Sequence, residues 1–265
     1  MQQSLNADFT QAVLIDTAGL PWQASPSPTV WRKRLELYGP AEAGRVTSVV
    51  RYDAGSAFPS HPHPEGEEIL VLEGVFSDQH GDYPAGTYLL NPEGFAHAPF
   101  SREGCVLFVK LRQYPGLDRP QVKIDTTQGD WQAGEAEGVE RLPLYEDAHY
   151  PERISLLRLA PGAAPAPAVQ PRGAEIFVLE GDLTANGRAL GTGAWLRLPA
   201  RGTLALSSAK GALAYFKEAN LLTPRLVATT SATPSAATTM PASAVGPSRS
   251  SNSRKAITAV VGGTR

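Results

Sequence analysis

The sequence predicts an all-β protein made of two tandem barrels of short strands. Short apolar runs at residues 46–52, 68–72, 86–90 and 105–109 alternate with turns, a spacing typical of β-sandwiches and barrels. The 265 residues include 25 glycines and 23 prolines, which suits many tight turns better than long helices. A chain of this length can hold two domains of ordinary size.

The second half of the chain repeats the first. A shift of 107 residues keeps one register without a gap from Ser48 to Lys110. Residues 71–74, with the sequence Val-Leu-Glu-Gly, fall on residues 178–181 with the same sequence. A match of this length indicates an internal duplication, so the second half is expected to repeat the fold of the first.

This pattern divides the chain into four predicted segments. Residues 1–44 form a lead-in whose strands join the barrels, and residues 45–118 form the first barrel. Residues 119–221 form the second barrel. Residues 222–265 are rich in Ser, Thr and Ala without apolar periodicity, so we expect them to form a disordered tail.

The charge is unevenly distributed. The chain carries a net charge of −2, and every charged residue after Leu222 is basic, which leaves about −7 for the preceding body. An acidic body argues against binding of nucleic acid, which requires a basic face. The basic residues of the tail are Arg225, Arg249, Arg254, Lys255 and Arg265.

The sequence favours a cytoplasmic protein. Cys105 is the single cysteine, so no disulfide can form within the chain. The first twenty residues lack the basic start and apolar run of a signal peptide. No apolar stretch reaches the length of about 18 residues that would cross a membrane.

Residues 55–67 have the clearest chemical signature. In an extended chain, residues two apart point to the same side. His61, His63 and Glu67 share one parity, and two imidazoles with a carboxylate on one side form a site for a transition metal. Pro62 and Pro64 cannot donate backbone hydrogen bonds, so we expect this stretch near a barrel mouth.

A fourth candidate ligand lies in residues 86–97. Gly86 begins a short apolar run, and the sequence Pro92-Glu-Gly94 predicts a tight turn. The chain then returns with His97. Three imidazoles and one carboxylate would suit one divalent transition metal.

The spacing of these residues resembles the two cupin motifs. The first motif, Gly-x5-His-x-His-x3-Glu-x6-Gly, is matched at every position from Gly55 to Gly74. The second, Gly-x5-Pro-x-Gly-x2-His-x3-Asn, is matched from Gly86 to His97 and departs at Ser101, where the motif has Asn. That last position is usually not a ligand, so the departure leaves the ligand set unchanged.

The surrounding sequence resembles the ChrR-type cupins over residues 20–220. The similar segments are residues 67–74, 81–88 and 105–111. The resemblance implies a bicupin fold, with two double-stranded β-helix or jelly-roll barrels, and the family's His, His, Glu, His ligand set at His61, His63, Glu67 and His97. The family includes the zinc-binding cupin half of ChrR anti-sigma factors and metal-dependent dioxygenases of small diketone or hydroxyketone substrates.

The second half lacks the candidate ligands. The 107-residue shift places apolar or amide residues at all four ligand positions, namely Ala168, Gln170, Ala174 and Leu204. The glycine and apolar framework is retained. We therefore expect a degenerate second barrel that has a structural role and no metal site.

Other polar residues are expected to be structural or exposed. Glu68 aligns with Glu175 in the half without ligands, which favours a structural role for both. Cys105 is interpreted as a core residue, with a position beside the metal as the alternative. Tyr83 and Tyr88 fit either the pocket or the core. Residues of loop-like sequence are expected at the surface: Glu65, His80, Asp82 and His149.

Two functions remain open from the sequence. Zinc held by four protein ligands would be structural or sensory, whereas iron(II), manganese or nickel would keep open positions for a chelating substrate. We expect zinc or iron first, with manganese or nickel as alternatives. The protein is then either a dioxygenase of small diketones or hydroxyketones, or a non-catalytic zinc-binding sensor or regulatory module.

The expected partner is a small molecule rather than a sigma factor. ChrR-type anti-sigma factors carry a helical N-terminal domain with its own His/Cys zinc site. The 44 residues before the first predicted barrel contain no cysteine. The resemblance is also compatible with a homodimer, because strand exchange between subunits is common among cupins.

Overall fold

The computed structural model describes residues 4–219 and the backbone of residues 238 and 239. Strands dominate this part of the chain, which contains no α-helix and only the two 3-10 turns η1 (Thr17–Gly19) and η2 (Thr126–Gln128). The all-β prediction is confirmed. The predicted segment boundaries stay predictions, and the tail predicted at 222–265 lies outside the described residues except for the backbone of residues 238–239.

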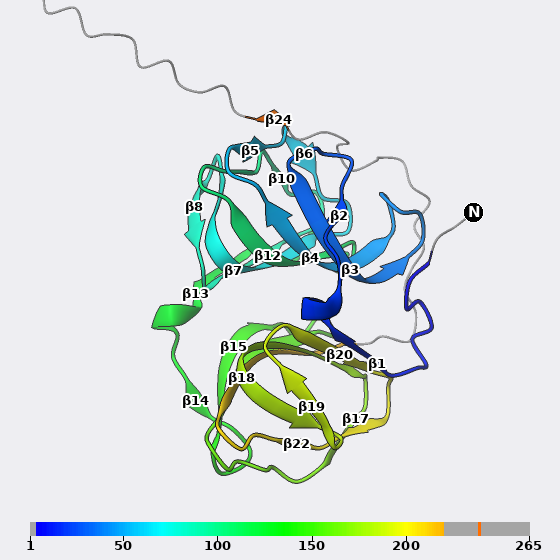
Figure 1. Ribbon diagram of the computed structural model, residues 1–265, viewed down its shortest axis with the longest axis vertical. Helices are drawn as coiled ribbons and strands as arrows, with labels where there is room; N and C mark the ends of the chain where they lie inside the picture. Colours follow the sequence, from blue (N-terminus) through cyan, green and yellow to red (C-terminus); the bar gives the residue numbers. More distant parts are fainter. Residues whose placement is uncertain (1–3, 220–237, 240–265) are drawn as a thin grey trace, which may run out of the picture.

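The first half forms the upper barrel in Figure 1. Its main sheet runs in the order β2-β3-β4-β12-β7-β11-β5-β24, β8 and β9 also pair with β7, and β6 pairs separately with β10. The bounds are β2 (Gln23–Ala24), β3 (Val30–Tyr38), β4 (Arg45–Tyr52), β5 (Ser56–Ala57), β6 (His61–Pro62), β7 (Glu67–Asp78), β8 (Gly81–Pro84), β9 (Thr87–Asn91), β10 (Ala96–His97), β11 (Phe100–Ser101), β12 (Cys105–Leu111) and β24 (Thr238–Thr239).

The second half forms the lower barrel in Figure 1 with the same topology. Its main sheet runs in the order β1-β20-β18-β23-β16-β15-β14, β19 and β22 also pair with β18, and β17 pairs separately with β21. The bounds are β1 (Val13–Asp16), β14 (Gln132–Ala133), β15 (Val139–Glu146), β16 (Arg153–Leu159), β17 (Ala168–Gln170), β18 (Ala174–Ala185), β19 (Arg188–Gly191), β20 (Ala194–Leu198), β21 (Gly202–Leu204), β22 (Leu206–Ser207) and β23 (Ala212–Glu218).

Each half places its first strand in the sheet of the other half. β1 pairs antiparallel with β20 of the second half. Strand β13 (Val122–Asp125), which leads into the second half, pairs antiparallel with β9 of the first half. The exchange is visible in Figure 1, where β1 lies against the lower barrel. The two barrels therefore depend on each other for complete sheets.

The core between the barrels draws side chains from both sheets. The rings of Phe108 and Phe177 stack with centroids 4.5 Å apart, and Tyr215 packs edge-on against Phe108. Leu70 and Leu156 belong to the same buried cluster. Burial of these apolar side chains stabilises the contact between the two halves.

Two buried lysines form polar contacts across this interface. The Lys110 ammonium pairs with the Glu175 carboxylate of the other half. The Lys217 ammonium donates to the hydroxyl of Tyr114 at 2.7 Å, and that hydroxyl donates to the Glu68 carboxylate of the first half. The Tyr215 hydroxyl donates to the other Glu68 oxygen at 2.8 Å. These contacts agree with the structural role expected for Glu68 and Glu175.

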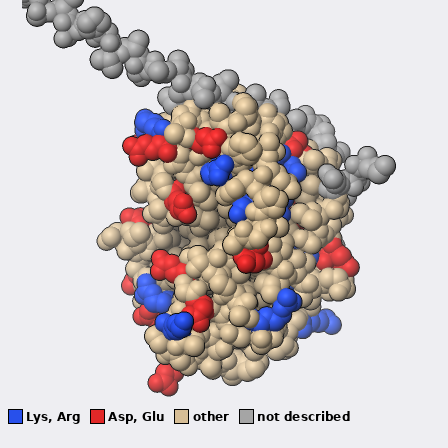
Figure 2. All heavy atoms as spheres, viewed as in Figure 1, with Lys and Arg blue, Asp and Glu red and all other residues tan. Residues whose placement is uncertain are grey.

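The surface view shows no broad basic area. On the face in Figure 2, basic and acidic side chains are interspersed among other residues. This face therefore lacks the basic patch that nucleic acid binding requires. In the part of the chain described here, nothing helical has the length and apolar character needed to cross a membrane.

The buried ion pair gives a testable prediction for stability. Replacement of Lys110 by Met would leave the Glu175 charge buried without its partner, and we expect this to lower the free energy of unfolding by about 3–5 kcal/mol. Urea denaturation followed by tryptophan fluorescence measures the change. The control is Arg102→Met, which breaks an exposed pair with Asp82 and should cost less than about 1 kcal/mol. Equal stability of the two variants would contradict the prediction.

Candidate metal centre

Two short strands bring the histidines together. β6 pairs with β10 so that His61 lies directly opposite His97. The His63 backbone continues this contact, since its N–H donates to the Phe95 carbonyl at 2.8 Å and its carbonyl accepts from Gly94 N at 3.0 Å. The prolines on either side of His63 lie where no ladder donor is required. Pairing of the two motifs thus defines the site.

A glycine turn delivers the carboxylate. Gly66 has φ +72°, and a Cβ there would lie 2.9 Å from the Asn91 carbonyl oxygen. Only glycine adopts this conformation without strain. The turn starts β7 at Glu67, whose side chain enters the barrel beside the histidines.

The four predicted side chains lie together and are buried. The Nε2 atoms of His63 and His97 are 2.9 Å apart, and Glu67 Oε2 is 3.5 Å from each of them. The three histidines offer nitrogen atoms within 4.8 Å of one another. The three imidazoles form a possible metal-binding site, while the ligand role of Glu67 stays a prediction.

Two of the histidines have their Nδ1 atoms anchored outside the cluster. His61 Nδ1 lies 2.9 Å from the Pro59 carbonyl oxygen, and His97 Nδ1 lies 3.1 Å from Asp78 Oδ2. A carbonyl or carboxylate oxygen only accepts, so Nδ1 carries the proton in both rings. In the neutral form of each ring, Nε2 then keeps the lone pair that a metal ligand requires.

The electrostatics of the cluster differ between the histidines. Burial lowers the pKa of His61 and, further, that of His63, where the neighbouring imidazoles add to the effect. Burial also opposes the charged form of His97, but the hydrogen bond to Asp78 and the charge of Glu67 outweigh it and raise its pKa. His61 and His63 are therefore neutral at neutral pH, so each can offer a nitrogen lone pair to a metal.

Sequence reasoning missed the polar residues that support the cluster. Asp78 contacts His97, and the Asn91 amide donates to Glu67 Oε2 at 3.1 Å. Gln121, which precedes β13, donates to Asn91 Oδ1 at 3.0 Å. Comparison of the two repeats could have identified Asp78 and Asn91. The 107-residue shift places apolar residues, Ala185 and Leu198, at their positions in the half without ligands.

The cluster lies in a small cavity inside the first barrel. The cavity has a volume of about 130 Å³ and is lined mainly by aromatic and aliphatic side chains, with the candidate ligands among them. Since one water occupies about 30 Å³ of liquid, this space suits a small molecule. Its walls include Tyr52, Phe58, Phe76, Leu107 and Arg112.

The second barrel has the same local geometry without the ligands. β17 pairs with β21 so that Ala168 lies opposite Leu204, which repeats the pairing of His61 with His97 at a shift of 107 residues. Ala174 and Leu204 are buried in an apolar cluster. Across the residues that the structure describes, no other group of His, Cys, Asp and Glu forms a candidate metal site.

The other polar residues follow the expectations with one exception. His80, Asp82 and His149 are exposed, as expected. Glu65 was expected at the surface, but it is buried. Its backbone has φ +58° and its carbonyl accepts from Tyr114 N at 2.7 Å, which holds the turn under the chain after β12.

The remaining candidates belong to packed regions. Cys105 is buried with Leu107 in the first barrel, and burial raises the pKa of its thiol to about 11. This agrees with the interpretation as a core residue. Tyr88 is buried in the core between the barrels, whereas Tyr83 donates its hydroxyl to Asp78.

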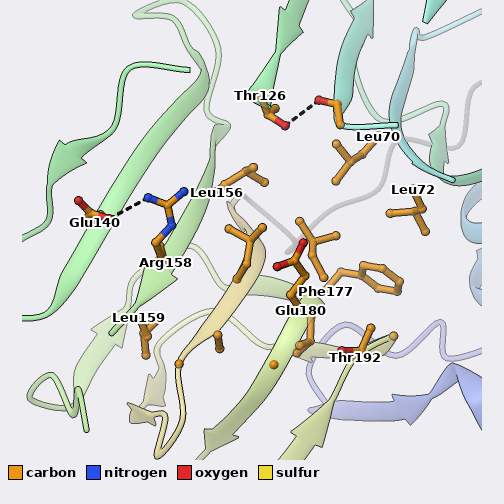
Figure 3. Close-up of a pocket in the computed structure, with 18 of the residues that line it drawn as sticks. Leu70, Leu72, Thr126, Glu140, Leu156, Arg158, Leu159, Phe177, Glu180 and Thr192 are labelled. Atoms are coloured by element: carbon orange, nitrogen blue, oxygen red, sulfur yellow. Dashed lines mark hydrogen bonds and ion pairs between the residues drawn. The ribbon is translucent and has the colours of Figure 1, made fainter. Parts of the chain in front are cut away.

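A larger groove lies between the barrels. It has a volume of about 1570 Å³ and is lined by both halves, including Leu72 and Phe177, with no histidine or cysteine in its lining. Figure 3 shows its leucine side chains and the ion pair between Glu140 and Arg158. The candidate metal ligands therefore lie in the smaller cavity.

Comparison with known proteins identifies the fold. A family model described as the ChrR cupin-like domain matches residues 10–115 and again residues 119–221. The search of curated proteins gives no significant match.

Solved structures give matches over most of the chain. A provisionally named dioxygenase from Nostoc punctiforme has 17% identity and a TM-score of 0.67, with 80% of this chain and 84% of that one covered. YlbA from Escherichia coli has 15% identity and a TM-score of 0.63, with 80% and 93% covered. The bacterial pirin YhhW from Escherichia coli, in complex with nickel(II), has 16% identity and a TM-score of 0.61, with 79% and 99% covered.

These identities show the fold alone. Together with the two tandem matches of the family model, they confirm the predicted bicupin fold. What each neighbour binds or catalyses belongs to that protein.

The ligand positions of the two halves provide a matched test. We expect His63→Ala to lose most of the metal, because one of four donors is removed from the centre. Gln170→Ala changes the equivalent position of the second half and should leave metal content unchanged. Elemental analysis of protein purified without chelators measures both. Metal loss in the Gln170 variant alone would mean that the site lies in the other half.

Proposed function

The chain belongs to the ChrR cupin-like family, and on this premise we propose that its first barrel binds one divalent transition metal through His61, His63, Glu67 and His97. The observation that carries the proposal is the convergence of three buried imidazoles, whose ligand nitrogens lie within 4.8 Å of one another, with a Glu67 oxygen 3.5 Å from two of them. Nitrogen and oxygen donors of this kind suit zinc, iron, manganese and nickel.

The donor set fits such an ion. Two imidazole nitrogens lie 2.9 Å apart, a contact that needs a proton on one of them, and a carboxylate oxygen lies 3.5 Å from both. A cation between them would satisfy lone pairs that protons alone satisfy poorly in a buried site. When bound, a divalent metal supplies Lewis acidity and, in the case of iron, the chemistry of dioxygen activation.

We propose a metal-dependent dioxygenase acting on a small diketone or hydroxyketone. The cavity has room for a small substrate, and its walls include apolar side chains such as Phe58, Phe76 and Leu107. Arg112 also lines the cavity, and its charge contributes to the lowered pKa of His63. A cation in the cavity lining would favour the enolate form of a substrate. The family resemblance supports the same substrate class.

Tyr52 adds a proton donor to the cavity lining. Burial raises its pKa well above the ordinary value, and the nearby Glu67 carboxylate raises it further. The hydroxyl therefore stays protonated and would donate to a substrate oxygen. Its place in the lining makes it a candidate for orienting the substrate.

The second candidate function is a non-catalytic zinc-binding sensor or regulatory module. The observation that favours it is the burial of all four side chains, each at most 8% exposed. Closed four-ligand zinc sites are structural. Zinc and iron remain the first candidates for the metal, with manganese and nickel as alternatives.

We also propose a cytoplasmic location with a small molecule as the main partner. The single buried thiol needs no oxidising compartment, and the acidic body disfavours nucleic acid. A sigma factor is not the proposed partner. A homodimer is compatible with the family resemblance, and sedimentation measures it directly.

Oxygen uptake separates the two functions. Protein loaded with iron(II) and supplied with a panel of β-diketones and hydroxyketones is expected to consume dioxygen in an oxygen electrode, and His97→Ala is expected to abolish the uptake. No turnover with iron, manganese or nickel, combined with zinc that survives dialysis against a chelator, would eliminate the oxygenase and favour the zinc module.

A further inference from the structure

Asp78 connects the candidate metal centre to a second layer of polar contacts. It ends β7, the strand that begins with Glu67. One carboxylate oxygen, Oδ2, lies 3.1 Å from Nδ1 of His97. The other oxygen accepts from the Tyr83 hydroxyl at 2.9 Å and from His80 N at 2.7 Å. The carboxylate is buried at 6% exposure and held on both sides.

We propose that Asp78 is a positioning residue that fixes the proton and the ring orientation of His97, so that Nε2 is available to the metal. The inference rests on the proposed metal site. Tyr83 in turn orients Asp78. Asp78 contacts His97 at Nδ1 and not at Nε2, the atom proposed as the ligand, and Tyr83 contacts Asp78.

The chemistry of the contact allows only one neutral tautomer of His97. A carboxylate has no proton to give, so the His97–Asp78 contact is a hydrogen bond only when Nδ1 carries the proton. The other neutral tautomer would place two lone pairs against each other at 3.1 Å in a buried site. Asp78 therefore selects the tautomer whose Nε2 faces His63 and Glu67.

The second half supplies an internal comparison. Asp78 and Tyr83 fall on Ala185 and Leu190, while His97 falls on Leu204. The strand register is the same, since Phe76 pairs with Tyr83 in the first barrel and Leu183 pairs with Leu190 in the second. An Asp–Tyr pair that only stabilised this hairpin would be useful in both barrels. Its restriction to the barrel with the histidines indicates that it serves His97.

The test uses two substitutions in the pair and one control. Asp78→Asn keeps the shape but loses the carboxylate, and Tyr83→Phe removes only the hydroxyl that holds Asp78. Asp82→Asn is the control, because Asp82 is an exposed acid on the neighbouring strand. Thermal denaturation of each full-length variant establishes that it is folded.

Two measurements report on the positioning role. Competition with a chelator is expected to show zinc or cobalt affinity lowered about 10–100-fold in Asp78→Asn, less in Tyr83→Phe, and unchanged in Asp82→Asn. Nitrogen-15 NMR of the metal-free protein is expected to show His97 protonated on Nδ1 in the wild type. The same spectrum should show loss of this single tautomer in Asp78→Asn.

The outcomes separate this inference from the proposed function. Wild-type affinity in Asp78→Asn, with the Nδ1 proton of His97 retained, would overturn the positioning role while leaving the metal site intact. A wild-type protein that binds no metal would overturn the proposed function, and the tautomer measurement on metal-free protein would still decide the role of Asp78. If Asp78→Asn does not fold, wild-type affinity and tautomer in a folded Tyr83→Phe would count against the proposal.

Discussion

The exchange of first strands between the halves is the constraint on which the rest of the structure depends. β1 completes the sheet of the second barrel, and β13 completes the sheet of the first. The buried lysines also connect the two halves. Lys110 pairs with Glu175 across the interface, and Lys217 donates to Tyr114, whose hydroxyl donates to Glu68. Removing one buried partner would leave the other charge uncompensated, which is costly. The barrels are therefore coupled in both sheet pairing and charge.

This coupling extends to the candidate metal centre. Gln121 stands just before the exchanged strand β13, and it holds Asn91, which in turn holds Glu67. A residue that leads into the second half thus orients a predicted ligand in the first. The second half contributes to the candidate site through this connection, even though Ala174 and Leu198 stand at the positions of Glu67 and Asn91 in its own barrel.

The second barrel lacks polar residues at the positions of Asp78 and Asn91, and this avoids a cost in free energy. A buried carboxylate or amide without a partner costs free energy. A barrel that lost its histidines but kept Asp78 and Asn91 equivalents would bury unpaired polar groups. Alanine and leucine at those positions avoid this cost, and the cupin framework of glycines and apolar strands is retained. The candidate ligands and their supports are present together in the first barrel and absent together from the second.

Much of the fold and the centre of the site could be predicted because they depend on local spacing. The parity of His61, His63 and Glu67 and the return of the chain at His97 require only short-range geometry. The strand exchange could not be predicted, because sequence periodicity does not reveal which sheet a lead-in strand joins. Asp78 and Asn91 were missed because each supports a ligand that is distant in sequence.

Glu65 shows a different limit of the sequence. Its polarity and the glycine that follows it predicted an exposed turn, but the turn is covered by the chain after β12, where Tyr114 N meets its carbonyl. Burial of a loop depends on which distant segment passes over it. No local pattern carries that information.

The exchange of strands β1 and β13 suggests how the duplicated chain arose. Two identical half-length polypeptides that traded their first strands would form a closed two-fold pair, each subunit finishing the other. Fusion of such a pair into one polypeptide would permit one copy to lose its metal ligands, provided that the strands exchanged between the copies still paired. The degenerate second barrel would then be retained because the sheet of the first barrel is incomplete without strand β13, whatever ligand the second barrel once bound.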